Sequence, residues 1–82
     1  MFSVEWSKEA RECLKKLDRT TAKRLVEKTE NIKETPYHFL RRMVGSDLWR
    51  LRIGDYRVLV QIDEVHKKLF VISLGHRKNI YK

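Results

Sequence analysis

Residues 49–60 read WRLRIGDYRVLV, and this stretch predicts a β-hairpin. Apolar and other residues alternate on both sides of Gly54-Asp55, a period of two that is typical of strands with one buried face. A Gly-Asp pair between two such runs predicts a two-residue hairpin turn. With these two residues in the loop, Ile53 faces Tyr56 and Arg52 faces Arg57. The buried face of the predicted hairpin then carries Trp49, Leu51, Ile53, Tyr56, Val58 and Val60.

The other face of the predicted hairpin carries three arginines, Arg50, Arg52 and Arg57. Like charges directly across a strand pair are unfavourable by up to about 1 kcal/mol, and a sheet does not need such a pair in order to fold. An anion between the guanidinium groups would relieve the repulsion, because a guanidinium can hold a phosphate through two parallel hydrogen bonds. The three side chains are therefore a candidate phosphate site. The alternative is that they extend into water as ordinary edge-strand charges.

The sequence before the hairpin predicts one strand and then two helices. Residues 2–6 alternate between apolar and polar side chains, as a short half-buried strand does. Ser7 can cap the first helix, and the polar residues 18–21 can cap the second. Pro36 is expected to close the second helix, because the residue before a proline is pushed out of the helical region. The apolar stripes of the two helices are Ala10, Cys13, Leu14 and Leu17, and Ala22, Leu25, Val26, Thr29 and Ile32.

The segments around the hairpin complete the predicted fold. Residues 37–46 form a basic connector, residues 63–68 a polar turn, and residues 69–74 a nearly continuous apolar run, which is typical of a strand covered on both faces. Residues 75–82 form a short basic tail. The predicted order is β-α-α-β-β-β, a single α+β domain over residues 1–82. Its helical hairpin packs on one face of a four-stranded, largely antiparallel sheet.

Length and charge narrow the function. Eighty-two residues make one domain, and no apolar run approaches the roughly 18 residues that a membrane span needs. No signal peptide is apparent at the N-terminus, so a cytoplasmic location is expected. Cys13 is the single cysteine, and its place on an apolar stripe predicts a small buried hydrophobe rather than a catalytic thiol.

Most of the positive charge lies in the second half of the chain. The formal net charge is +8; residues 1–34 carry nine Lys and Arg against seven Asp and Glu, whereas residues 35–82 carry ten against four. Nucleic acid is the commonest anion that a basic surface of this kind binds. A solvated basic face that serves only solubility is the alternative.

The C-terminal tail adds further candidate residues. Tyr81 can stack on a nucleobase, or it can pin a loose C-terminus to the sheet. The imidazole of His76 could act as an acid or base, although a histidine beside an arginine is more often a hydrogen-bonding surface residue. His38 and His66 have no metal-ligand spacing to each other or to Cys13, so no metal site and no cofactor are expected.

Three stretches resemble toxins of the RelE type. The first is VEWSKEA followed by LKKLD near the N-terminus, and the second runs from PYH through RMVG to WRLRIGDYRV. The third is ISLGHRKNIY at the C-terminus. The resemblance covers essentially the whole chain, and its specific parts are the Gly-Asp-Tyr-Arg-Val hairpin and the Gly-His-Arg…Tyr ending. It implies the toxic half of a type II toxin–antitoxin pair in the RelE/ParE superfamily.

The resemblance also implies a reaction and residue roles. RelE-like toxins enter the ribosomal A site and cut mRNA without a metal: the ribose 2′-OH attacks the neighbouring phosphate and leaves a cyclic phosphate and a free 5′-OH. By position, Arg57 would hold the scissile phosphate, Arg77 would assist the leaving oxygen, and Tyr81 would stack or relay a proton. The expected RNA contacts are Arg50, Arg52, His76, Lys78 and Arg42.

One departure from the family pattern affects the expected chemistry. Arg50 and Arg52 stand where the well-characterised relatives carry lysines, and arginine is effectively never deprotonated. These two side chains are therefore expected to act as electrostatic clamps. The general base is then Tyr81, His76 or a ribosomal group.

Two rival functions and one partner follow from the same features. A ParE-like gyrase poison shares the fold but needs neither the phosphate grip nor the terminal tyrosine. A non-catalytic nucleic-acid-binding module would keep the basic face and tolerate the loss of any one donor. The expected protein partner is a RelB-like antitoxin that offers an amphipathic helix and acidic residues.

Overall fold

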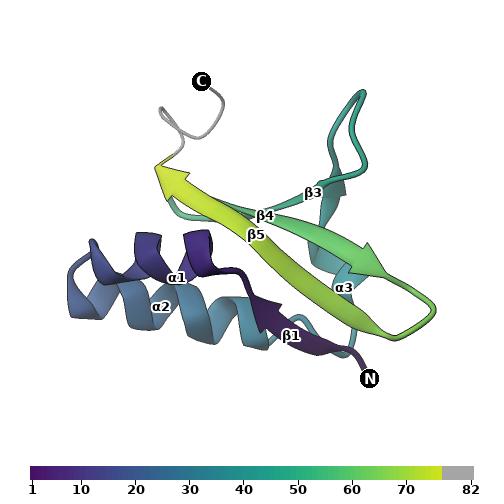
Figure 1. The fold of residues 1–82 in the computed structure, drawn as a ribbon, viewed down its shortest axis with the longest axis horizontal. Coiled ribbons are helices and arrows are strands. Elements are labelled where there is room, and N and C mark those ends of the chain that lie inside the picture. The colour runs from purple at the N-terminus through teal and green to yellow at the C-terminus, as the bar shows by residue number, and fades with distance from the viewer. Residues whose placement is uncertain (77–82) are drawn as a thin grey trace.

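A computed structural model of the chain describes residues 1–76, and it shows helices packed on one face of a single sheet (Figure 1). The prediction of an α+β fold with a helical hairpin on a largely antiparallel sheet is confirmed. The elements in chain order are β1 (Ser3–Trp6), α1 (Lys8–Lys15), α2 (Arg19–Glu30), α3 (Pro36–Phe39), β2 (Arg41–Arg42), β3 (Trp49–Ile53), β4 (Tyr56–Asp63) and β5 (Lys68–His76).

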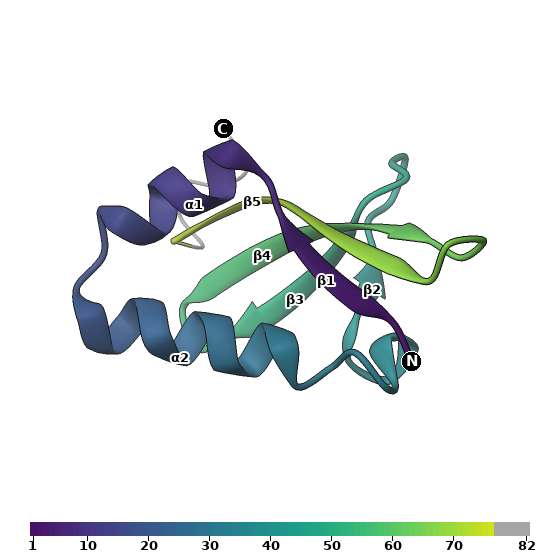
Figure 2. The same ribbon diagram turned by 60° about the horizontal axis from the view of Figure 1, so that its bottom comes forward.

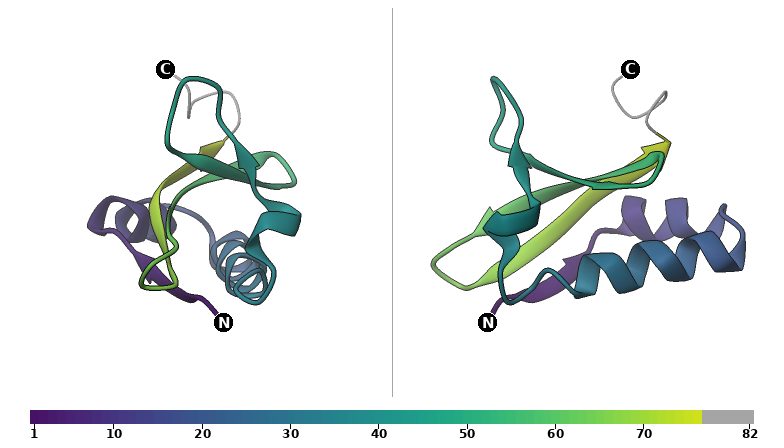
Figure 3. Two further views of the ribbon diagram at one scale, coloured as in Figure 1. Left: turned by 90° about the vertical axis from the view of Figure 1, so that its right-hand side faces the viewer. Right: turned by 180° about the vertical axis from the view of Figure 1, so that it is seen from behind.

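The sheet has five strands in the order β1-β5-β4-β3-β2, one more than predicted. β1 runs parallel to β5, and the other neighbours are antiparallel. The additional strand, β2, has only two residues and pairs with the start of β3. This strand was not predicted, because two charged residues carry no alternation of apolar and polar side chains. Figure 2 shows α1 and α2 as an antiparallel pair beside the sheet, and Figure 3 shows the β2–β3 loop projecting away from it.

The predicted hairpin register is confirmed. Ile53 pairs with Tyr56 and Arg52 with Arg57 across the Gly54-Asp55 turn, where Gly54 takes a φ of +59° that favours glycine. The inward residues of the hairpin join the core, although Trp49 and Tyr56 stay half-buried. The buried apolar residues are Phe2, Ala10, Leu25, Ile32, Leu40, Leu51, Ile53, Val58, Val60, Leu69, Val71 and Leu74.

A β-bulge in β5 explains why its sequence reads as a continuous apolar run. Leu59 pairs with Ser73 but Val60 pairs with Val71, so Ile72 is the extra residue. The buried residues of β5 are Leu69 and Val71 before the bulge and Leu74 after it. The extra residue thus shifts the alternation of buried and exposed side chains by one position. The run therefore does not reflect two fully covered faces, since Phe70 and Ile72 remain partly exposed.

Ser7 joins the bulge to the first helix. Its hydroxyl oxygen accepts from the backbone N–H of Ala10 at 3.0 Å, which confirms the predicted N-cap, and donates to the carbonyl of Ile72 at 2.7 Å. The backbone N–H of Ser7 donates to the carbonyl of Val71 at 2.9 Å. One residue thus satisfies a helix terminus and the carbonyl of the bulged residue.

The predictions for residues 31–46 were wrong in two respects. The second helix ends at Glu30 rather than at Pro36, although Ile32 beyond it is still buried. Pro36 begins the short helix α3, where its missing N–H costs nothing. The expected connector thus holds α3 and β2. At the start of this connector, the Tyr37 ring contacts the rings of Phe2 and Trp49 edge-on, with centroids 6.3 and 5.4 Å away.

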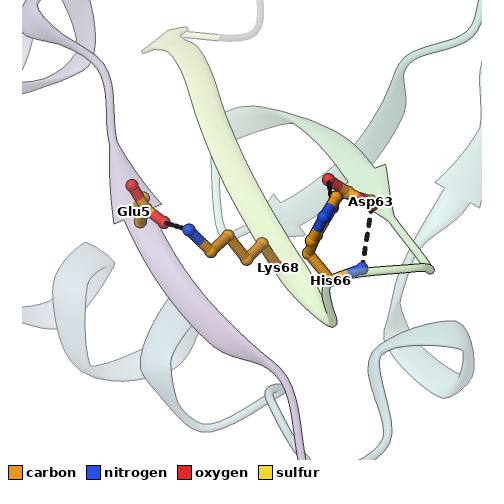
Figure 4. A network of polar contacts seen from close by, with 4 residues as sticks. All are labelled: Glu5, Asp63, His66 and Lys68. Carbon is orange, nitrogen blue, oxygen red and sulfur yellow. Dashed lines mark hydrogen bonds and ion pairs between the residues drawn. The ribbon is translucent and has the colours of Figure 1, made fainter.

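Polar contacts fix the far end of the sheet (Figure 4). Lys68 on β5 binds Glu5 on β1 at 2.9 Å, and this hydrogen bond raises the pKa of the lysine. In the β4–β5 turn, Asp63 accepts from the backbone N–H of His66 at 3.1 Å and contacts its ring at 2.8 Å. These two hydrogen bonds lower the pKa of Asp63. Exposed ion pairs of this kind add little stability.

Cys13 is half-buried and packs against the core, as its place on the apolar stripe predicts. Among residues 1–76, no helix is long and apolar enough to cross a membrane.

Replacing Ser7 with alanine should lower the free energy of unfolding by about 1–2 kcal/mol, because the helix loses its cap and the Ile72 carbonyl loses its donor. Urea denaturation measures the change. Ser3→Ala, an exposed serine four residues earlier in β1, is the matched control and should change stability by less than about 0.5 kcal/mol. Equal losses in the two variants would contradict the bridging role of Ser7.

Candidate nucleic-acid interface

Four arginines lie on the sheet face that points away from the core. Arg52 pairs with Arg57 across the hairpin, as predicted, and Arg41 pairs with Arg50 between β2 and β3. Directly opposed residues of antiparallel strands project to the same side, so two like-charged pairs stand next to each other. We call Arg41, Arg50, Arg52 and Arg57 the arginine cluster.

Arg41 is the member of the cluster that the sequence analysis missed. The predicted candidate was its neighbour Arg42, which pairs with Trp49 and so projects to the opposite face. Arg42 instead forms an ion pair with Asp47 at 3.7 Å in the β2–β3 loop. Only the pairing of β2 with β3 distinguishes the two arginines, because successive residues of a strand alternate between faces.

The arginine cluster lines a hollow of about 280 Å³. Phe39 and Leu51 also line it, and among residues 1–76 no carboxylate does. Within residues 1–76, no ion pair joins Arg41, Arg50 or Arg52 to an acidic side chain. Arg50 and Arg52 are exposed, so their guanidinium groups can meet an anion from solvent, and Arg57 beside them is half-buried.

Two residues of β5 continue the face beside the cluster. Arg57 pairs with Gly75, and Leu59, which pairs with Arg50 on its other side, pairs with Ser73. Glycine has no side chain, so β5 adds no Cβ beside Arg57 at this position. Repulsion within the cluster favours an anion such as a phosphate.

The structure does not bring His76 to the arginine cluster. It pairs with Tyr56, whose ring faces the helices with Ile53, and the two aromatic rings meet edge-on at 5.6 Å. The bulge at Ile72 sets this orientation, because it reverses the phase of all later residues in β5. Three other predicted site residues, Arg77, Lys78 and Tyr81, lie outside the described residues.

Comparisons with known proteins identify the family of this chain. The family model described as the ParE toxin of type II toxin–antitoxin systems matches residues 4–81. The chain is a RelE/ParE-superfamily toxin. RelE4 of Methanocaldococcus jannaschii is 34% identical over 71 residues, which cover 84% of this toxin and 76% of RelE4.

Solved structures of toxin–antitoxin complexes share the toxin's fold. The RelBE2 complex of Mycobacterium tuberculosis matches with a TM-score of 0.83 and 25% identity, over 93% of this toxin and 98% of that chain. The RelE–RelB complex of Pyrococcus horikoshii matches with a TM-score of 0.76 and 25% identity, over 95% and 97%. The matching family model is thus one of ParE toxins, whereas the matching solved structures contain RelE-type toxins.

Removing one charge from a like-charged pair should stabilise the free toxin. We expect Arg52→Thr to raise the free energy of unfolding by up to about 1 kcal/mol at low ionic strength, because Arg57 loses its opposed positive charge. The gain should shrink as salt screens the repulsion. Arg42→Thr is the matched control, since it removes the same charge from the other face. Urea denaturation at low and high salt measures the free energy of unfolding of both variants. An equal gain in the two variants would contradict cross-strand repulsion.

Proposed function

We propose that this toxin is a cytoplasmic, ribosome-dependent mRNA endoribonuclease. The arginine cluster is the observation that supports the proposal most. Two like-charged pairs on one sheet face repel and should lower the stability of the unbound protein. A phosphodiester held between them would neutralise this repulsion, which favours binding. A cleavage reaction that develops negative charge on a phosphate gains most from such a preorganised set of donors.

The proposed reaction is an internal transfer at one phosphate of the mRNA. The 2′-OH of the preceding ribose loses its proton and attacks the phosphorus. The bond to the 5′-oxygen of the next nucleotide breaks, and that oxygen takes up a proton. The products are a cyclic phosphate and a free 5′-OH. The nucleophile and the leaving group both belong to the RNA, so the protein has to supply only charge stabilisation and proton transfer, and in this proposal no metal or cofactor takes part.

Arg57 is proposed to hold the scissile phosphate and to stabilise its developing charge. It lies in β4 at the centre of the face, with Arg52 on one side and Gly75 on the other. Arg41, Arg50 and Arg52 would share the negative charge of the same phosphodiester. Arg77 is proposed to assist the leaving oxygen, and Tyr81 to stack on a nucleotide or relay a proton.

The cluster contains no group that can take the proton from the 2′-OH, because all four members remain cationic. The orientation of His76 toward Tyr56 makes it a poor candidate for this role. We therefore propose that Tyr81 or a ribosomal group acts as the base. The requirement for the ribosome would then follow because the arginine cluster supplies positive charge but no base.

The described relatives also suggest a partner and a rival function. Two of them are complexes with antitoxins, so we propose a RelB-like antitoxin whose acidic residues cover the arginine cluster. The family description by ParE favours a gyrase poison as the second candidate. That function acts on a protein–DNA complex and gives the cluster no scissile RNA phosphate.

The proposal predicts that Arg57→Ala lowers the rate of mRNA cleavage on purified ribosomes by about 100-fold or more, since one transition-state donor is lost. The matched pair Arg41→Ala and Arg42→Ala should separate the two faces: Arg41→Ala slows cleavage and Arg42→Ala leaves it close to wild type. Primer extension on a defined mRNA maps the cuts.

Two results would contradict the ribonuclease. A single 2′-O-methyl group on the ribose before the cut must block cleavage, because it removes the nucleophile; continued cutting there would rule out the proposed reaction. Intact mRNA together with toxin-dependent breaks in gyrase-bound DNA would assign the protein to the second candidate.

A further inference from the structure

A second hollow adjoins the one that the arginine cluster lines. It lies between α2 and β3, has a volume of about 420 Å³, and shares Phe39, Leu51 and Arg52 with the first. The other lining residues are Arg24, Lys28, Asn31, Ile32, Ile53 and Gly54. The two hollows are thus separated by a wall of three residues.

The short length of β2 creates this arrangement. β2 pairs only with Trp49 and Arg50, so no strand within the described residues pairs with this edge of β3 from Leu51 onward. α3 ends beside that edge, where the adjoining Leu40 is buried while Phe39 stays 47% exposed. The Phe39 ring contacts His38 edge-on at 4.8 Å and borders both hollows.

The second hollow has the chemistry of a nucleotide subsite. Its floor is apolar, since it consists of Ile32, Leu51 and Ile53. Each of these side chains is at most 5% exposed. Its rim carries the cations of Arg24 and Lys28 and the amide of Asn31, and the part of the chain that the structure describes adds no carboxylate to the lining. Aromatic and apolar surfaces that border cations bind single-stranded nucleic acid by base stacking and phosphate contact.

The guanidinium group of Arg24 lies against the hairpin turn at Gly54. A Cβ at this glycine would lie 3.3 Å from both terminal guanidinium nitrogens of Arg24, so the side chain of Arg24 lies over the turn. Arg52, two residues earlier, lines both hollows. The cations of the second hollow therefore continue the arginine cluster rather than form a separate patch.

We propose that Phe39 is a base-stacking platform and that the hollow between α2 and β3 is a second nucleotide subsite. Single-stranded RNA held by the arginine cluster passes over Phe39, and its next phosphate meets Arg24 and Lys28. This inference rests on the proposed function, because the RNA reaches Phe39 from the cluster. An acidic amphipathic peptide is the competing occupant, but the exposed ring between two cationic hollows favours RNA.

Fluorescence anisotropy with 2′-O-methyl RNA, which cannot be cleaved, tests the proposal. We expect Phe39→Leu to weaken binding of a labelled hexanucleotide roughly tenfold and Phe39→Trp to preserve it, because only the second keeps a ring. The double variant Arg24→Ala/Lys28→Ala should weaken the hexanucleotide but not a dinucleotide, and should make the hexanucleotide affinity less dependent on salt. Thermal unfolding checks that Phe39→Leu stays folded.

The double variant Lys15→Ala/Lys16→Ala is the matched control. It removes two exposed charges from the end of α1, and the affinity for the hexanucleotide should exceed that of the α2 double variant. Equal affinities in the two double variants, or wild-type affinity in Phe39→Leu, would overturn the subsite. So would an α2 double variant that binds RNA normally but no longer binds a synthetic peptide of Glu and Leu.

The same assay separates this inference from the function on which it rests. If Arg57→Ala weakens the dinucleotide while Phe39→Leu and the α2 double variant bind both RNAs normally, the arginine cluster stands and the subsite is wrong. If Arg57→Ala binds both RNAs normally, the proposed phosphate grip itself fails.

Discussion

The Gly54-Asp55 turn is the constraint on which the rest of the structure depends. Gly54 takes a positive φ, and the two-residue loop sets the pairing of β3 with β4. A slip of one residue would move every side chain of a strand to the other face. In the observed register the core receives Leu51, Ile53, Val58 and Val60, and the opposite face receives the arginines. Core and candidate site are thus two consequences of one turn.

The β5 bulge makes a second adjustment on the same face. It keeps Leu69 and Val71 in the core before Ile72 and Leu74 in the core after it. The same change of phase brings Gly75 opposite Arg57 and turns His76 toward Tyr56. Ser7 stabilises the bulge through the carbonyl of Ile72, so the N-terminal strand and helix help to determine the space beside Arg57.

Local patterns were sufficient to predict most of the fold and part of the candidate site. The hairpin register follows from a turn of two adjacent residues, and three of the four clustered arginines follow from that register. Arg41 could not be predicted, because the two residues of β2 carry no periodicity and their faces depend on a distant strand. The orientation of His76 was missed for a similar reason, since a bulge is set by packing against the core and by Ser7 rather than by the local sequence. The second helix was predicted too long because Pro36 was taken as its end rather than as the start of α3.

The central claim is that four arginines on one sheet face hold a single phosphodiester. NMR spectra of the arginine Nε–Hε groups, recorded while a 2′-O-methyl dinucleotide is added, test it most directly. The account predicts that the signals of Arg41, Arg50, Arg52 and Arg57 shift together and saturate with one dissociation constant, while the signal of Arg42 stays in place. Shifts of similar size across all arginines, Arg42 included, would indicate a diffuse basic surface and contradict the account.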